Sequence, residues 1–317
     1  MKRLERKDDN IHFLMDAKNR PRISVKPGET LEIETVRADN MYLSRENPFF
    51  RNHDHVMSVL ANPVTGPVFV EGAMPGDRLC VKIEDIILAD SGNEGYYTYV
   101  PGQGVFANPY YSQDYPPQTE WCDVRGNMTE LRMGGRLVPV ETEPFIGTIG
   151  VAMERDVTYS FYSSKSMLGN VDCHYIKKGS TVVMPVNVEG ALLSLGDLHA
   201  KQGAGELLGC AVECDGRVTI SVDIIKADNP SWFGWPQVNT DKFIGSLGFR
   251  NYSIENSIKE AVFDLIKRVE YDCRVPFMDA YMIAGQCVNV EICQMLGEAC
   301  AALATIDRKL LAPFYQK

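Results

Sequence analysis

The clearest indication of a β fold is the sequence ELLGCAVECDGRVTISVDII, residues 206–225. Apolar and polar residues alternate on both sides of Asp215-Gly216, and a period of two residues is typical of a strand with one buried face. Asp-Gly between two alternating runs is a common hairpin turn. The sequence therefore predicts two strands here that pair through a turn at Asp215-Gly216.

The same pattern extends upstream. Alternation begins again at about residue 145, in IGTIGVAME (146–154) and STVVMPVNVEGALLSLGDLHA (180–200). It also occurs between residues 22 and 87, in RISVKPGETLEIET and VFVEGAMPGDRLCVKIEDII. In the last two, the alternating runs flank Pro27-Gly28 and Pro75-Gly76. A Pro-Gly turn between two such runs predicts paired strands.

Between these β segments lies a stretch of different composition, residues 89–144. It includes GNEGYYTYVPGQGVFANPYYSQDYPPQTEWCD, which is rich in Gly, Pro, Tyr and Asn and fits neither a helix nor a regular sheet. Such a stretch is usually a long surface loop. We expect it to cover a cleft, and the alternative is a solvent-facing linker between two domains.

Helical spacing appears only after residue 225. In SIENSIKEAVFDLIKRVEYD (253–272), Ser257 and Glu260 are spaced like a capping box. Pro276 suits the first turn of a second helix that ends near Gly285, and a third helix is predicted over about 297–311. One face of the first helix is apolar; it is formed by Ile258, Val262, Leu265, Ile266 and Val269.

These elements predict an α+β fold that is mostly β, with two β-sandwich or barrel-like blocks and a helical C-terminal part. The length of 317 residues permits two domains. We expect an N-terminal β block with the long Gly/Pro/Tyr-rich loop in residues 1–144. Residues 145–317 would form the second β block and the C-terminal helices.

Composition narrows the class of function. The chain is 45% hydrophobic and 23% charged, as globular proteins are, and its net charge of -10 disfavours nucleic acid and anionic membrane partners. MKRLERKDDN at the start is not a signal peptide, and no run of about 18 apolar residues occurs. Nine scattered cysteines without C-x-x-C spacing suggest buried thiols in a reducing compartment. We therefore expect a cytoplasmic protein that acts on a small molecule.

Candidate chemistry is concentrated in LSLGDLHAKQGAGE (193–206). Asp197 and His199, two residues apart, point to the same face of a strand, and the flanking glycines let the backbone turn towards Glu206. Asp172 of the preceding GNVD element completes a set of one imidazole and two or three carboxylates, which suits a divalent ion of the zinc class. The alternative is that Asp172 and Asp197 are turn residues that accept backbone N–H groups, with His199 an ordinary histidine.

Other catalytic arrangements have weaker support. No G-x-S-x-G elbow occurs, and no P-loop or G-x-G-x-x-G follows a strand. Cys173 beside Asp172 is the best-placed cysteine nucleophile, with a core role as the alternative. His53 and His55, in the triplet HDH, either reach the site from the first β block or lie on the surface.

The run GNVDCHYIKKGSTVVMPVNVEGALLSLGDLHAKQGAGELLGCAVE (169–213) resembles the core of the acetamidase/formamidase family. That family carries G-N-[ML]-D, K-G-S-T, G-A-L-x-S-x-G-D-x-H-A and Q-G-x-G-E elements in this order. NPVTGPVFVEGAMPGDRLCVKI (62–83) is similar to the family's hairpin, and AYMIAGQCVNVEICQML (280–296) is similar to its final helical segment. The likeness extends from about residue 22 to residue 295.

The resemblance implies a metal-assisted hydrolase of small aliphatic amides of the formamide and acetamide type, which yields a carboxylate and ammonia. It also implies a mostly β fold and a homodimer or larger homo-oligomer. Carried over to this sequence, Asp172, Asp197 and His199 become the metal ligands, with zinc the expected divalent ion. Glu206 and Asp172 become the catalytic residues, with Glu206 the proton-transfer group.

Two positions depart from the family pattern. Ala204 replaces the aspartate of the usual Q-G-D-G-E turn, and Asn62 stands where the hairpin usually begins with histidine. These departures leave two alternatives open. One is a non-catalytic small-molecule or metal binding protein on the same scaffold, and the other is a hydrolase of small cyclic amides (lactams).

Overall fold

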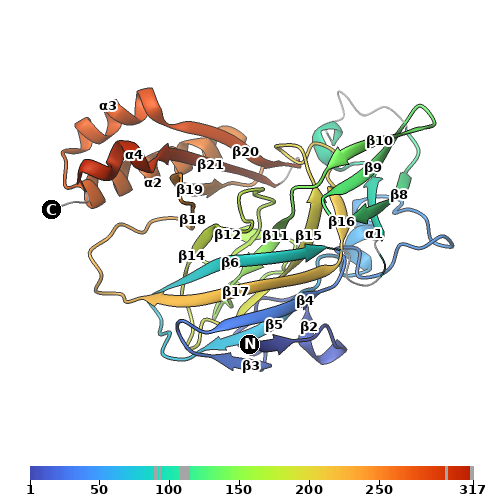
Figure 1. Cartoon of the computed structure of the whole chain (residues 1–317), viewed down its shortest axis with the longest axis horizontal. Coiled ribbons are helices and arrows are strands. Elements are labelled where there is room, and N and C mark those ends of the chain that lie inside the picture. Colours follow the sequence, from blue (N-terminus) through green and yellow to red (C-terminus); the bar gives the residue numbers. More distant parts are fainter. Residues whose placement is uncertain (89–91, 93, 108–114, 297–298, 315–317) are drawn as a thin grey trace.

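Two large β-sheets form most of the protein, and the helices α2, α3 and α4 gather at one end (Figure 1). The computed structural model describes residues 1–88, 92, 94–107, 115–296 and 299–314. The predicted class, a mostly β α+β fold with a helical C-terminal part, is confirmed. Neither sheet closes into a barrel within the described residues.

The first sheet has nine strands in the order β1-β4-β17-β6-β14-β18-β19-β21-β20. All its neighbours are antiparallel except β1 and β4. Its strands are β1 Lys2–Leu4, β4 Thr30–Thr35, β6 Arg78–Leu88, β14 Thr181–Pro185, β17 Gly216–Ile225, β18 Gln237–Asn239, β19 Phe243–Phe249, β20 Asn289–Met295 and β21 Cys300–Asp307.

The second sheet has the order β10-β9-β8-β7-β16-β15-β11-β13-β12, and β5 also pairs with β15 and with β2 and β3. Its strands are β2 Ile11–His12, β3 Ile23–Val25, β5 Val64–Val70, β7 Glu94–Tyr99, β8 Gln118–Arg125, β9 Met128–Met133, β10 Arg136–Glu141, β11 Phe145–Gly150, β12 Ser163–Ser164, β13 Leu168–Asn170, β15 Leu193–Lys201 and β16 Val212–Cys214. Strands from both sides of residue 144 lie in each sheet. The division of the chain into residues 1–144 and 145–317 stays a prediction.

The main hydrophobic core contains side chains from both sheets. Ile33 of β4 and Ile83 of β6 come from the first sheet, and Ile146 of β11 and Leu195 of β15 come from the second; all four are 0% exposed. Burying one such side chain contributes about 1.5–3 kcal/mol. The alternating pattern in the sequence therefore reports this shared core correctly.

The predicted hairpins are wrong, because each of the three turns carries the chain from one sheet to the other. Asp215 separates β16 of the second sheet from β17 of the first, and Pro27-Gly28 lies between β3 and β4, which also belong to different sheets. Pro75-Gly76 likewise connects β5 to β6. Gly216 does not take a positive φ, and its backbone lies too close to the Ile87 carbonyl for any side chain. Close approach of two strands explains this glycine better than a hairpin turn.

The segment 89–144 is more regular than its composition suggests. It forms β7 to β10, which extend the second sheet as an antiparallel meander. The prediction of an irregular loop is therefore wrong for residues 94–99 and for most of 118–141, while residues 89–91, 93 and 108–114 lie outside the described part. Tyr96 and Trp121 pair across β7 and β8, and aromatic residues stabilise such cross-strand pairs.

The helical predictions are partly confirmed. α2 (Ile254–Cys273) and α3 (Phe277–Cys287) form as expected. The cap of α2 is Ser253, whose hydroxyl accepts the N–H of Asn256, so the capping-box prediction at Ser257 is wrong. Ser257 lies inside the helix and donates to the Cys300 carbonyl, 2.8 Å away.

The third predicted helix, about 297–311, is mostly strand β21. The segment 280–296, expected to be helical from the resemblance, ends in strand β20. β20 and β21 pair along the edge of the first sheet, and only α4 (Arg308–Leu311) is helical, while residues 297–298 lie outside the described part. The alanines of CAALATID favour a helix locally. However, seven of the eight residues of β21 are buried or nearly so between β19, β20 and α2, and packing overrides this preference.

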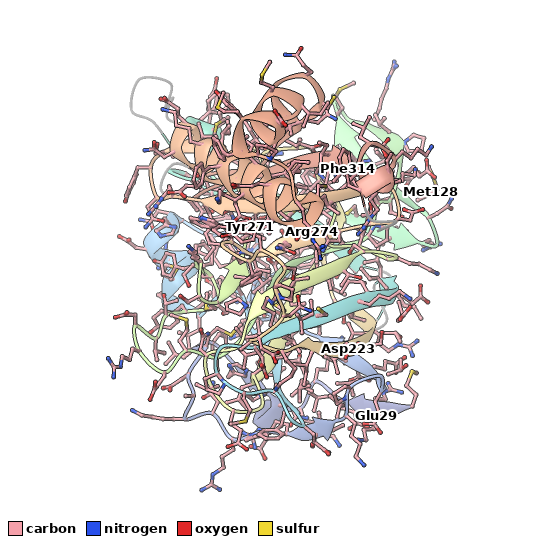
Figure 2. All side chains as sticks on the ribbon, turned by 90° about the vertical axis from the view of Figure 1, so that its left-hand side faces the viewer. Glu29, Met128, Asp223, Tyr271, Arg274 and Phe314 are labelled. Carbon is pink, nitrogen blue, oxygen red and sulfur yellow. The ribbon has the colours of Figure 1, made fainter. Side chains whose placement is uncertain are left out.

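α2 covers the first sheet at its β19–β21 end. Its apolar face, including Leu265 and Val269, packs with Ile244 and Ile306 of the sheet in a separate buried cluster. Figure 2 shows this helical layer at one end of the molecule, with Tyr271 and Arg274 labelled at the end of α2. No helix among the described residues is long and apolar enough to span a membrane.

The remaining helical elements of the described chain are short. α1 (His53–Ser58) begins at Asn52, whose side chain accepts the N–H of His55. Three short 3-10 turns cover Asp8–Asn10, Gly104–Phe106 and Ala312–Phe314.

His12 of β2 predicts a loss of stability in mild acid. Burial lowers the pKa of His12 to about 4, and its Nε2 lies 2.9 Å from the Ser194 hydroxyl, which suits the neutral ring. Between pH 6.5 and 4 the unfolded chain binds a proton at this residue that the folded chain does not, so the free energy of unfolding falls as pH falls through this window, by at most about 3 kcal/mol.

Urea denaturation of the parent protein and of His12→Gln at pH 7 and pH 4.5 would measure this effect. The stability advantage of the parent should shrink by about 2–3 kcal/mol at the lower pH, because the glutamine does not titrate. An equal difference at both pH values would contradict the prediction.

Candidate active site

The backbone around β15 brings the predicted site residues together. Asp197 and His199 lie on β15 between β11 and β16. Asp172 follows β13, and its N–H is 3.4 Å from the Gly147 carbonyl of β11. Glu206 lies in a turn that is fastened to β20, because the Met295 N–H donates to the Gly205 carbonyl at 2.9 Å. Asp172, Asp197 and Glu206 all have a positive φ, which re-aims their side chains.

His199 is at the centre of a buried cluster of carboxyl groups. Its Nε2 lies 3.2 Å from Asp197 Oδ1, 3.3 Å from Glu213 Oε2 and 3.8 Å from Asp172 Oδ1. One ligand atom each from Asp172, Asp197 and His199 lies within 4.8 Å of the others. We call these three residues together with Glu206 and Glu213 the carboxylate cluster; each member is at most 6% exposed.

Gly147 makes room for this cluster. The register of β11 against β15 places it opposite Asp197. A Cβ at this position would lie 2.5 Å from Asp197 Oδ2, 2.6 Å from Asp172 Oδ1 and 2.9 Å from the His199 ring. Since these distances are well below van der Waals contact, even alanine would displace the cluster.

A set of amide and hydroxyl groups holds the carboxylates in place. Asn62 Nδ2 and Thr148 Oγ1 each donate to Asp197 Oδ2 at 3.1 Å. Gln294 Nε2 of β20 donates to Asp172 Oδ2 and is 3.5 Å from Glu206 Oε2. Hydrogen bonds of this kind fix the direction in which the remaining carboxylate oxygens point.

Burial and mutual repulsion perturb the protonation of the cluster. For Asp172, burial and the charges of Glu206 and Asp197 raise the pKa well above its usual range. Burial also raises the pKa of Glu206, to about 7. Burial alone would lower the pKa of His199, but the charges of Glu213 and Asp197 outweigh it and raise that pKa well above the usual value.

This charge distribution fits a bound cation. Four carboxyl groups surround one imidazole, so a single imidazolium cannot balance them if they ionise. Asp172 Oδ1 and Glu213 Oε2 are buried and have no hydrogen-bond partner within the described part of the chain. Carboxylate oxygens and a neutral imidazole nitrogen are the donor set of a divalent ion of the zinc class.

The structure places the predicted residues Asp172, Asp197, His199 and Glu206 in one site. Asp197 accepts hydrogen bonds from side chains and lies in a strand, and His199 is 1% exposed. Among the hydrogen bonds found in the described residues, none supports the alternative in which the two aspartates are turn residues. Of the two departures from the family pattern, Asn62 contacts the cluster, whereas Ala204 is exposed.

Sequence reasoning missed Glu213 and Gln294. Glu213 lies between buried residues on β16, and an acidic residue in such an apolar run is a signal of a buried carboxylate. Gln294 had no comparable signal, because it comes from the segment expected to be helical, and it is brought to the site by the tertiary pairing of β20 with Gly205.

The other histidines lie elsewhere. His53 of α1 lines a cavity beside the cluster, and its Nδ1 is 2.9 Å from Gln103 Nε2. His55 accepts the N–H of Arg51 and does not line this cavity. His174 pairs with Glu291 at 3.1 Å. Cys173 is fully buried, and none of the nine cysteines, all of them described, forms a disulfide.

A cavity of about 550 Å³ opens onto the cluster. Asp197, Glu206 and Glu213 line one part of it, with Asn62 and Gln294. Residues of the 89–144 segment, including Tyr96 and Gln103, form another wall. A small molecule in this cavity can therefore reach the carboxylate cluster.

The fold and the site together define a protein with two open β-sheets and a buried acidic and imidazole centre suited to a divalent ion. The sequence matches the model of the Acetamidase/Formamidase family over residues 2–168 and 162–274. The chain belongs to the acetamidase/formamidase family, as the resemblance implied.

Individual relatives agree with this assignment. The acetamidase of Mycolicibacterium smegmatis is 28% identical over 258 residues, which cover 64% of this chain and 63% of that protein. The chain thus spans less than two thirds of the length of this relative. The crystal structure of an acetamidase from Bacillus halodurans is 28% identical, with a TM-score of 0.87 over 98% of this chain and 99% of that one. A structure of a predicted acetamidase/formamidase from Thermoanaerobacter tengcongensis has the same identity and TM-score over 100% and 98%.

Proposed function

We propose that this protein hydrolyses the C–N bond of a small non-peptide amide of the formamide and acetamide type, with the help of a divalent metal ion, and releases a carboxylate and ammonia. The observation that carries this proposal is the carboxylate cluster around His199 at the inner end of a cavity of about 550 Å³. Family membership and the names of its relatives support the choice of amides.

Asp172, Asp197 and His199 are the residues that would hold the ion, because their ligand atoms converge. When bound, an ion of the zinc class supplies a Lewis acid that polarises a carbonyl and lowers the pKa of water towards about 7. Asn62 and Thr148 orient Asp197, and Glu213 lies against the His199 ring. Zinc as the particular ion stays a prediction, as does the homodimer or larger homo-oligomer.

Glu206 is the residue we assign to proton transfer. Glu206 lines the cavity, and the Gln294 side-chain amide contacts both Glu206 and Asp172. Glu206 is not one of the three residues whose ligand atoms converge. Its carboxylate would take a proton from the attacking water as the oxygen bonds to the carbonyl carbon. The same proton then passes to the nitrogen as the C–N bond breaks, because ammonia is a far better leaving group than an amide anion.

The test is ammonia release from formamide, acetamide and propionamide by the purified protein, before and after dialysis against a chelator and after addition of Zn²⁺. We expect release that the chelator abolishes and the metal restores. The absence of ammonia from all three amides in the metal-loaded protein would overturn the proposal. Tight binding without turnover would favour a binding protein on the same scaffold.

A further inference from the structure

The cavity has two chemically different parts. Its polar part is formed by Asp197, Glu206 and Glu213 of the carboxylate cluster, with Asn62, Asn170 and Gln294. Its other wall is made by Phe50, Ala61, Val100 and Phe161, with Val56 of α1 and Tyr96 of β7. We call these six residues the apolar wall.

The apolar wall belongs to a hydrophobic cluster that is separate from the main core. Its buried members come from two segments of the chain, residues 43–61 and 96–100. The partly buried residues packed against them are Tyr42, Val59, Trp121, Phe161 and Cys210. Small hydrophobic clusters of this kind lie under loops and pack separately from the main core. Here the six residues of the apolar wall also line the cavity, so an apolar ligand in the cavity would contact this cluster.

The size of the cavity does not match the smallest amides. Acetamide has four non-hydrogen atoms and would occupy roughly 120 Å³ if each atom takes the volume of about one water molecule, roughly 30 Å³. The cavity of about 550 Å³ is more than four times larger. Pockets of about 300–1,000 Å³ with a mostly apolar lining and a few polar groups usually hold much larger ligands.

We infer, on the basis of the proposed amide hydrolysis, that the preferred substrate is a primary amide with a bulky apolar acyl group of about six carbons or more. Its amide group lies at the carboxylate cluster and its hydrocarbon part lies against the apolar wall. Acetamide reaches the same reacting groups but leaves the wall uncovered. The acyl group therefore determines specificity, while the cluster determines the reaction.

A series of primary amides tests this inference. We expect kcat/KM to rise from acetamide through butyramide to hexanamide and phenylacetamide, by on the order of 10²-fold in total, because each methylene buried in a fitting pocket favours the longer substrate by several-fold. The binding affinity of the same amides, measured by calorimetry with chelator-treated protein, should rise in the same order.

A pair of variants on α1 localises the effect. Val56→Phe adds bulk to the apolar wall and should lower the ratio of kcat/KM for hexanamide to that for acetamide by at least about tenfold. Met57→Phe introduces the same side chain at the next residue of α1, which does not line the cavity, and should leave this ratio unchanged. Matching circular dichroism spectra and melting temperatures would show that both variants fold.

The outcomes separate this inference from the proposed function. Hydrolysis of acetamide with no gain for longer amides would overturn the inference and leave the proposed function standing. No hydrolysis of any amide, with hexanamide binding more tightly than acetamide and losing that advantage in Val56→Phe, would overturn the proposed function but support the apolar ligand class. Equal binding of all the amides would overturn the inference whatever the turnover.

Discussion

Replacing Glu206 by glutamine is expected to lower kcat for acetamide by on the order of 10²- to 10⁴-fold, the usual contribution of a positioned proton-transfer group. Glutamine has nearly the same shape, and its Oε1 can still accept the Gln294 amide that is 3.5 Å from the present carboxylate oxygen. What it loses is the ability to take a proton from water and to give it to the leaving nitrogen.

Two measurements accompany this prediction. Metal content should be unchanged in Glu206→Gln, because Glu206 is not one of the three converging ligand residues. Glu143→Gln, which changes a half-exposed carboxylate paired with Lys201, should retain full activity as a matched control. A kcat for Glu206→Gln within a few-fold of the parent would remove Glu206 from proton transfer.

Replacing His199 by alanine is expected to abolish retention of the metal ion. His199 is the only imidazole in the carboxylate cluster, and its Nε2 is the atom on which three carboxylates converge. Metal content after dialysis should fall from about one ion per chain to a tenth or less of that value.

Thermal unfolding provides an independent readout of the same prediction. A ligand that binds only the folded state stabilises it by about 2.7 kcal/mol at 100 times its Kd. Added Zn²⁺ should therefore raise the melting temperature of the parent but not that of His199→Ala. His55→Ala, which changes a histidine outside the cluster, should behave like the parent. Equal metal content in His199→Ala and the parent would exclude His199 as a ligand.

The sequence predicted the class of fold because alternation reports burial, and most strands of this protein do bury one face or both. It predicted the wrong strand partners at Asp215-Gly216, Pro27-Gly28 and Pro75-Gly76 for a physical reason. A strand followed by a turn and another strand alternates in the same way whether the second strand returns beside the first or crosses to the opposite sheet. Only tertiary packing decides between these two arrangements.

The candidate site was predictable where its residues share one segment. Asp197, His199 and Glu206 lie within ten positions, and Asp172 belongs to the GNVD element that precedes them. Gln294 was out of reach because it is 88 residues from Glu206 along the chain. Gly147 was equally hidden, since its importance lies in the space it leaves open and not in any group it offers.

The attachment of the Glu206 turn to β20 has a consequence for biosynthesis. The ribosome adds residues from the N-terminus, so β15 and the ligand residues emerge well before β20 does. Until Gln294 and Met295 have been synthesised, the Gly205 carbonyl lacks its bond to the Met295 N–H, and the Asp172 carboxylate lacks its bond to the Gln294 amide. A nascent or truncated chain that lacks β20 should thus carry the proposed ligand residues without a fully formed centre.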